Sequence, residues 1–117
     1  MHMSVSTPFS SIDQMFQKLA ATGLLVRVSE LDVRTNAAAA GVQTAESLAQ
    51  QAVMYKYVVG SYLRNVPAAQ RGGITLWGLS DNYSWLYNNN VEHPLLYDKD
   101  YNRKPAYTAF LQALKGK

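Results

Sequence analysis

Apolar residues near the start of the chain recur at steps of three and four, which predicts one buried stripe along a helix: Ile12, Met15, Phe16 and Leu19. Thr7–Pro8 precedes this stretch and Gly23 follows it, as is typical of residues that begin and end helices. The next run, residues 24–33 (LLVRVSELDV), is too short and too rich in β-branched side chains for a second helix and predicts a strand. Because this run is largely apolar, we expect both faces of the strand to be covered, as in a parallel sheet.

The longest predicted helix lies in the middle of the chain. A connection of polar and small residues, 34–43 (RTNAAAAGVQ), leads to Thr44, where the helix is expected to begin, and the helical pattern continues to about Leu63. The apolar residues of this helix share one side at three- and four-residue spacing: Leu48, Ala52, Tyr55, Val59 and Tyr62.

Turn-forming residues separate this helix from the last part of the chain. The pair Gly72–Gly73 breaks the chain ahead of a second predicted strand over residues 74–79 (ITLWGL). A long aromatic loop is expected over residues 80–103, and Pro105 is well placed as the first residue of a closing helix. The expected buried face of that helix consists of Tyr107, Phe110, Leu111 and Leu114.

Helical and strand patterns alternate along the chain. This alternation predicts an α/β fold in which parallel strands are flanked by helices and joined by right-handed crossovers. Two or three strands make an incomplete sheet with unpaired edges.

Composition narrows the class of protein. The length of 117 residues suits one modest domain and excludes a complete (β/α)₈ barrel, which needs roughly 250 residues. The absence of cysteine excludes disulfides and thiolate metal sites. The net charge of +3 comes from scattered Lys and Arg, so no nucleic-acid surface is indicated. No run approaches the ~18 apolar residues of a membrane span, and residues 1–23 lack the apolar core of a signal peptide.

Two acids, Glu30 and Asp32, lie near the carboxyl end of the first predicted strand. The two-residue period of a strand places both carboxylates on one face, together with Val26 and Val28. Active sites of parallel α/β sheets gather at this end of the strands, and burying an unpaired charge is costly, so a functional role is one interpretation. The other is that the strand is ending and both acids are solvated, which the residues alone favour by a small margin.

The two tryptophans occupy different settings. Trp77 shares a strand face with Leu79, which indicates a core position. Trp85 lies in a polar loop, where its ring could stack on a sugar or belong to a small hydrophobic cluster, and the residues favour neither.

The two histidines carry little signal by themselves. A histidine at position 2 would ordinarily be a solvated residue near the end of a chain. His93 adjoins Glu92 and Pro94 in a loop, where a turn is a better interpretation than a metal site because no third ligand is suitably spaced. We therefore expect no metal and no cofactor.

Three stretches, taken in order, resemble the carboxyl-terminal part of a glycoside hydrolase family 10 endo-β-1,4-xylanase. VRVSELDVR (26–34) resembles the strand-7 motif, ITLWGLSDNYSWL (74–86) the strand-8 motif, and PLLYDKDYNRKPAY (94–107) the run into the last helix. The resemblance implies a partial (β/α)₈ TIM barrel from the end of strand 6 through helix 8. The 117 residues would then be a C-terminal fragment of the catalytic domain.

The resemblance also implies site residues. Glu30 would be the catalytic nucleophile of a retaining hydrolase acting on xylan. MHM at the start of the chain stands where the family has a histidine at the end of strand 6, so His2 would hydrogen-bond to Glu30, with Asp32 orienting it. Trp77 and Trp85 would line the cleft that holds the xylose rings.

One part of the family's machinery has no counterpart in these residues. The family's acid/base Glu follows an Asn at the end of strand 4, and the sequence contains no such segment. Asp81 and Glu92 do not match that motif and are given no such role. We therefore expect this chain alone to be inactive on xylan.

Two further interpretations stay open on the sequence. The chain could be a non-catalytic carbohydrate-binding or interaction module that uses its Trp and Tyr surface, or a degenerate fragment without activity. On the xylanase interpretation, its substrate partner would be xylan or a xylo-oligosaccharide, with no nucleic acid and no membrane. Because a barrel fragment exposes strand edges and helix faces, it would also need the missing N-terminal barrel part or would self-associate. The parent enzyme would be secreted, periplasmic or attached to the cell surface.

Overall fold

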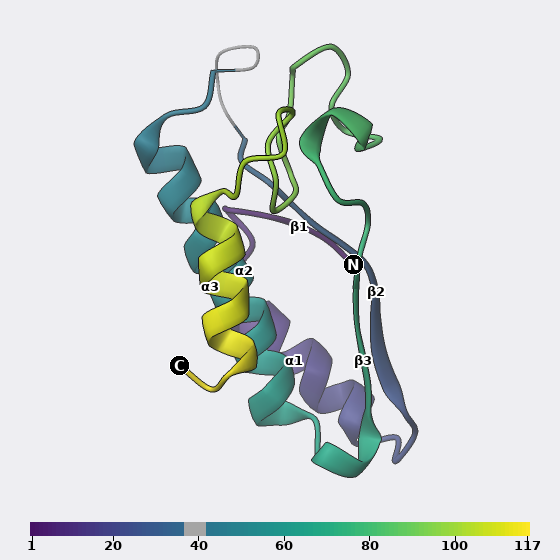
Figure 1. The fold of residues 1–117 in the computed structure, drawn as a ribbon. Coiled ribbons are helices and arrows are strands. Elements are labelled where there is room, and N and C mark those ends of the chain that lie inside the picture. Colours follow the sequence, from purple (N-terminus) through teal and green to yellow (C-terminus); the bar gives the residue numbers. More distant parts are fainter. Residues whose placement is uncertain (37–41) are drawn as a thin grey trace.

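The computed structural model describes residues 1–36 and 42–117 and contains a parallel sheet of three strands in that part of the chain (Figure 1). The strands are β1 (His2–Ser4), β2 (Val26–Arg34) and β3 (Arg71–Leu76), in the spatial order β1-β2-β3. The predicted parallel sheet is confirmed. Of the predicted connection over residues 34–43, residues 37–41 lie outside the described residues.

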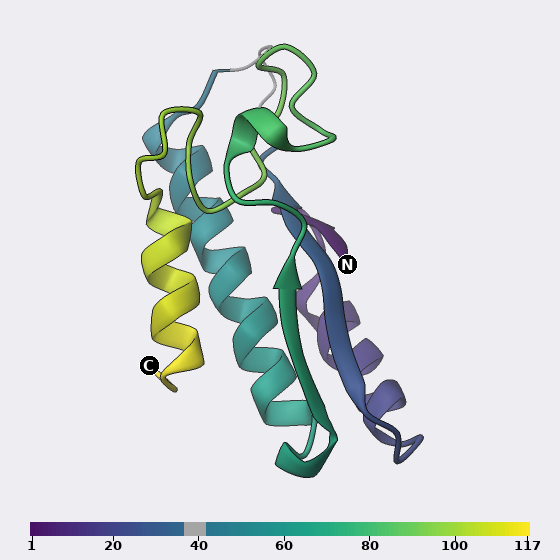
Figure 2. The ribbon, with the colours of Figure 1, turned by 45° about the vertical axis from the view of Figure 1, so that its right-hand side comes forward.

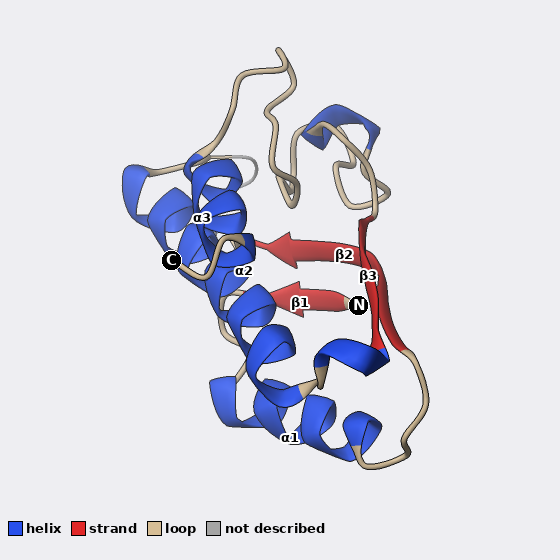
Figure 3. Cartoon of the chain, turned by 60° about the horizontal axis from the view of Figure 1, so that its bottom comes forward, coloured by secondary structure: helices blue, strands red, loops and turns tan. Residues whose placement is uncertain are grey.

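Three helices flank the sheet: α1 (Phe9–Ala20), α2 (Ala45–Asn65) and α3 (Pro105–Leu114). Figure 3 shows the three helices gathered on one side of the strands, and Figure 2 shows α3 running alongside α2. Two short 3₁₀ turns, η1 (Ala68–Gln70) and η2 (Asp81–Tyr83), stand before and after β3. The long loop after β3, residues 77–104, lies at the carboxyl ends of β2 and β3 (Figure 1).

Local sequence sets the helix ends as predicted. Thr44 is the N-cap of α2: its hydroxyl accepts the Ser47 N–H, while the Ser47 hydroxyl accepts the Thr44 N–H, a reciprocal capping box. Pro105 is the first residue of α3, where its lack of an N–H costs nothing. These ends depend on residues close in sequence, which is why the pattern located them.

The hydrophobic core lies between the sheet and the helices. From α1 it receives Ile12 and Phe16, as predicted, whereas Met15 is half-buried and Leu19 remains 42% exposed. The helix α2 is buried over a wider arc than one stripe, because it contacts the sheet, α1 and α3: its buried residues are Gln51, Met54, Tyr55, Val58, Val59, Ser61 and Tyr62.

The strand boundaries differ from the prediction. The strand expected over 74–79 occupies Arg71–Leu76, so Gly72–Gly73 lie inside β3 and do not break the chain. A Cβ on Gly72 would lie 3.1 Å from the Arg27 Cβ, so a residue without a side chain allows β2 and β3 to approach. At the start of β2, Leu24 and Leu25 fall outside the strand and are 68% and 74% exposed.

The buried face of α3 is also different from the prediction. Ala106 and Ala113 are its buried residues, Tyr107 and Phe110 are half-buried, and Leu111 and Leu114 are exposed by 38% and 46%. Phe110 packs edge-on against Tyr55 of α2, with 6.2 Å between the ring centroids, and both Tyr107 and Phe110 pack against the core cluster.

Candidate active site at the carboxyl ends of the strands

A bulge in β2 sets the direction of the Glu30 side chain. Val28 pairs with Ile74 and Leu31 pairs with Leu76, so β2 has one more residue than β3 between these pairs. Glu30 lies in that bulge with φ of 54°, in the left-handed region that few non-glycine residues occupy.

After the bulge, the alternation of inward- and outward-facing side chains along β2 is shifted by one residue. Val26 and Val28 before it and Leu31 and Val33 after it all belong to the same core cluster. The prediction that Glu30 and Asp32 share a face with Val26 and Val28 is therefore wrong. The interpretation that both acids are solvated is wrong for Asp32, which is 0% exposed; Glu30 is half-buried.

His2 contacts both carboxyl groups. The parallel register of β1 on β2 pairs His2 with Asp32. His2 Nδ1 lies 2.9 Å from Asp32 Oδ1, and His2 Nε2 lies 3.3 Å from Glu30 Oε2. Because an ionised carboxylate only accepts hydrogen bonds, Nδ1 donates to Asp32 when that group is charged. One imidazole thus bridges a buried and a half-buried carboxyl group.

Trp85 joins this group from the loop after β3. Its indole N–H donates to Asp32 Oδ2 at 2.8 Å, and its ring packs edge-on to His2 with 5.2 Å between ring centroids. The Arg34 guanidinium carbon lies 5.8 Å from the Trp85 ring centroid. The indole is 58% exposed and does not belong to the core cluster.

Trp77 lies just beyond β3 and is 45% exposed, so the core position predicted for it is wrong. Its backbone N–H donates to the Leu31 carbonyl at 3.0 Å, which keeps it beside β2. Gly78 follows with φ of 127° and turns the chain, and Leu79 is 59% exposed. Among the described residues, no hydrogen bond or ring contact joins Trp77 to His2, Glu30 or Asp32.

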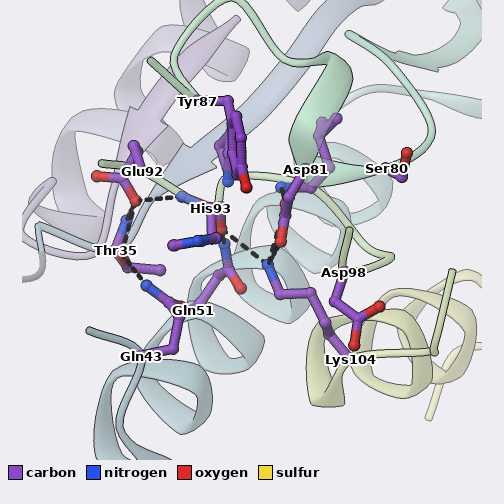
Figure 4. Close-up of polar contacts among 12 residues, drawn as sticks. Thr35, Gln43, Gln51, Ser80, Asp81, Tyr87, Glu92, His93, Asp98 and Lys104 are labelled. Carbon is purple, nitrogen blue, oxygen red and sulfur yellow. Dashed lines mark hydrogen bonds and ion pairs between the residues drawn. The ribbon is translucent and has the colours of Figure 1, made fainter. Parts of the chain in front are cut away.

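The Glu92 side chain links the loop that contains Trp85 with the residues that follow β2 (Figure 4). The sequence pattern does not predict this role. Its carboxylate accepts the Thr35 N–H at 2.9 Å and the Thr35 O–H at 2.6 Å. It also accepts backbone N–H groups of Asn36 and His93 at 3.2 and 3.0 Å. Burial acts to raise the pKa of Glu92, but these hydrogen bonds hold that pKa below its ordinary value.

The expected turn at Glu92–His93 lies just before this pair, over residues 88–91. Gln51 and Lys104 also contact this segment, and both donate to the His93 carbonyl, at 2.7 and 2.8 Å. The sequence offered one signal for Gln51, a polar side chain on the apolar side of a helix. Across residues 1–36 and 42–117 there is no cluster of three metal-ligating side chains and no helix long and apolar enough to cross a membrane.

Comparisons of sequence and of structure with known proteins point to the same family. The sequence profile of glycosyl hydrolase family 10 matches residues 1–113. Endo-1,4-beta-xylanase A of Cellvibrio japonicus is 36% identical over the whole chain, which spans 22% of that relative's length. The native structure of xylanase 10C from the same organism superposes with a TM-score of 0.93 at 35% identity, covering 100% of this chain and 28% of that one. A mutant of xylanase 10C in complex with xylopentaose superposes with a TM-score of 0.91 at 36% identity, covering 100% of this chain and 26% of that one.

Proposed function

The chain belongs to glycosyl hydrolase family 10, and from this premise we propose that it forms the nucleophile-bearing part of a retaining endo-1,4-β-xylanase. The observation that carries the proposal is the contact of His2, in β1, with both Glu30 and Asp32, in the adjacent parallel strand β2. The loop that carries Trp85 adds to this group from the carboxyl end of β3, and active sites of (β/α)₈ enzymes lie at the carboxyl ends of the strands. The xylopentaose complex of a relative supports xylo-oligosaccharides and xylan as the substrate class.

In the proposed mechanism, a carboxylate oxygen of Glu30 attacks the anomeric carbon of a xylose unit. The bond from that carbon to the leaving oxygen breaks, a glycosyl-enzyme ester forms, and water then hydrolyses the ester with net retention. The leaving oxygen takes its proton from a second carboxyl group, which lies ~5–5.5 Å from the nucleophile in retaining enzymes. The resemblance to the family implies that this proton donor is a Glu that follows an Asn, a pair that the 117 residues do not contain. Asp81 and Glu92 do not match that motif and are engaged elsewhere, Asp81 with Lys104 and Glu92 with Thr35.

His2 and Asp32 are positioning residues in this scheme. Asp32 fixes the imidazole through Nδ1, and the Nε2 side then faces the Glu30 carboxylate. The left-handed backbone at Glu30 supports a functional role, because such strain persists at sites where the surrounding structure imposes it.

Trp85 and Trp77 are the proposed sugar-contacting residues. An aromatic face offers an apolar platform for the C–H groups of a sugar ring, and both indoles are substantially exposed. These exposed rings also favour the second candidate function, a carbohydrate-binding module without catalysis.

Substitution of Glu30 tests the proposal. We expect the isolated 117-residue chain not to hydrolyse an aryl xylobioside. In a protein where this chain is joined to the proton-donating part of the barrel, Glu30→Ala should lower kcat by about five orders of magnitude. Glu46→Ala, on the exposed start of α2, is the matched control and should leave kcat unchanged.

The possible outcomes separate the two candidate functions. Loss of kcat with retained xylo-oligosaccharide affinity supports Glu30 as the nucleophile. Sugar binding without turnover in any assembled form supports the binding module. Turnover by the isolated chain that Glu30→Ala abolishes would show that the proton donor lies within these residues.

A further inference from the structure

The loop over residues 80–104 is closed by a buried ion pair (Figure 4). Lys104 Nζ lies 3.0 Å from Oδ2 and 3.3 Å from Oδ1 of Asp81, and it donates to the His93 carbonyl at 2.8 Å. Asp81 Oδ1 also accepts the backbone N–H of Leu95 at 2.8 Å. The side chains of Asp81 and Lys104 are 1% and 5% exposed, so the pair is removed from water.

The burial of this pair distinguishes it from the other ion pair of the same loop, Lys99–Asp100 at 2.9 Å, which is exposed and joins two neighbouring residues. Burial raises the pKa of Asp81 and lowers the pKa of Lys104 against their mutual attraction, so each group is shifted toward its neutral form. A buried ion pair is weak evidence for stability, but it restricts the segments it joins to one arrangement. This makes Asp81–Lys104 a candidate positioning device.

One of the segments that meet at the ion pair is fixed to the end of β2. The backbone N–H of Val33 donates to the Pro94 carbonyl at 3.1 Å. The Gln51 side chain donates to the carbonyls of Val33 and His93 at 2.9 and 2.7 Å. The Tyr55 hydroxyl donates to the Pro94 carbonyl at 2.6 Å. Residues 93–95 thus form a rigid base against β2 and α2.

The other segment carries Trp85. Asp81 begins η2, the Ser84 N–H donates to the Asp81 carbonyl at 3.0 Å, and Trp85 follows directly. Within the described part of the chain, the side chain of Trp85 makes one hydrogen bond, to Asp32. The ring also contacts His2 edge-on and lies beside the Arg34 guanidinium, but Trp85 is 58% exposed, so its position depends on where η2 is held.

We propose that the buried Asp81–Lys104 ion pair positions Trp85 against Asp32 by locking η2 onto the base formed by residues 93–95. Neither member of the pair touches the substrate; both act through Trp85. The consequence for sugar binding rests on the proposed function, whereas the position of the indole does not.

Nuclear magnetic resonance of this chain, isotope-labelled and assembled with the unlabelled remainder of the barrel, tests this proposal. The chain has two tryptophans, so it has two indole N–H signals, and Trp77→Phe assigns the signal of Trp85. The double variant Asp81→Asn/Lys104→Met removes both charges and keeps an oxygen that can accept the Leu95 N–H. We expect the Trp85 indole signal to move toward that of a free indole and its N–H to exchange with water about tenfold faster, as for the loss of one hydrogen bond to a charged acceptor. Lys99→Met, which removes the exposed pair of the same loop, should change neither.

A folded double variant with an unchanged Trp85 signal would overturn the proposal even if its melting temperature falls, because the pair would then only stabilise the fold. If the double variant does not fold, Asp81→Asn/Lys104→Gln, which also removes both charges but keeps a group able to hydrogen-bond at each position, carries the same expectation. In the assembled xylanase the double variant should raise KM for xylo-oligosaccharides more than it lowers kcat. Absence of xylanase activity in the unsubstituted protein would contradict the proposed function and leave the indole result standing.

Discussion

At the scale of single residues, the candidate site depends on backbone conformations that residues with a side chain rarely adopt. Glu30 is left-handed at φ of 54°, and Gly78 turns the chain at φ of 127° between Trp77 and Leu79. The first directs the carboxylate toward His2, and the second brings the loop after β3 over the strand ends. Glu30 is the proposed nucleophile and Gly78 adjoins Trp77, a proposed sugar-contacting residue; such strain is usually found at functional sites.

Substitution of Gly78 is expected to be costly for two reasons. A Cβ there would lie 2.9 Å from Leu95 Cδ1, and the positive φ disfavours any residue with a side chain. Gly78→Ala should therefore lower the free energy of unfolding by about 1–3 kcal/mol, the scale of overpacking a core. Urea denaturation measures this. Gly73→Ala is the matched control, because its φ is also positive at 104° but nothing lies within 4 Å of its Cβ. Equal losses in the two variants would show that the contact with Leu95 contributes nothing.

At the scale of elements, α1 and α2 are joined by a polar contact as well as by the core. The Asp13 carboxylate of α1 accepts hydrogen bonds from the side chains of Ser61, Tyr57 and Asn65 of α2. The hydrogen bonds from Ser61 and Tyr57, with the charge of Arg64, hold the pKa of Asp13 below its ordinary value of 3.8. The ionised carboxylate therefore supports this helix pair.

The lowered pKa of Asp13 determines the direction in which pH changes its contribution to the stability of the fold. A carboxyl group with a lower pKa in the folded state contributes stability above its unfolded pKa, and that contribution disappears as pH falls through the folded value. Asp13→Asn should lower the melting temperature at pH 6–7, and the difference from the unsubstituted chain should shrink below about pH 3.8. Thermal melts at pH 7, 5 and 3 measure it. A difference that stays constant over this range would show that charge at Asp13 plays no part.

At the scale of the whole molecule, the described residues form an open sheet with helices on one side. Its strands β1 and β3 lie at the two edges, and its overall extents are 42 × 26 × 24 Å. Large apolar side chains remain exposed at both ends of the strands, among them Leu24, Leu25 and Leu79. Such surfaces and strand edges favour association with other chains.

We therefore expect the isolated 117-residue chain to self-associate at micromolar concentration. Size-exclusion chromatography with light scattering should give a mass above that of the 13.0 kDa monomer. Leu24→Gln/Leu25→Gln, which reduces exposed apolar area without altering a strand, should lower the associated fraction. A sharp monomer peak with cooperative thermal unfolding would contradict the expectation.

The sequence determined the features that depend on neighbouring residues. The alternation of helices and strands from α1 onward, the start of α2 at Thr44 and the start of α3 at Pro105 are predicted correctly, because periodicity and caps act within a few residues. The short strand β1 is not predicted by the pattern, because its place is decided by its pairing with β2. The three ordered motifs also indicated the family, which the matches to known xylanases confirm.

Only the tertiary structure decided which side chains face inward and which charges are buried. The two-residue period of β2 fails at Glu30 because β2 forms a bulge where it pairs with β3. The residues of β2 alone do not predict this bulge. Asp32 is buried because His2 and Trp85, 30 and 53 residues away, donate to its two oxygens. Asp81 depends in the same way on Lys104, 23 residues further along. A charge becomes tolerable in a protein interior only when partners distant in sequence satisfy it, and the fold alone brings those partners together.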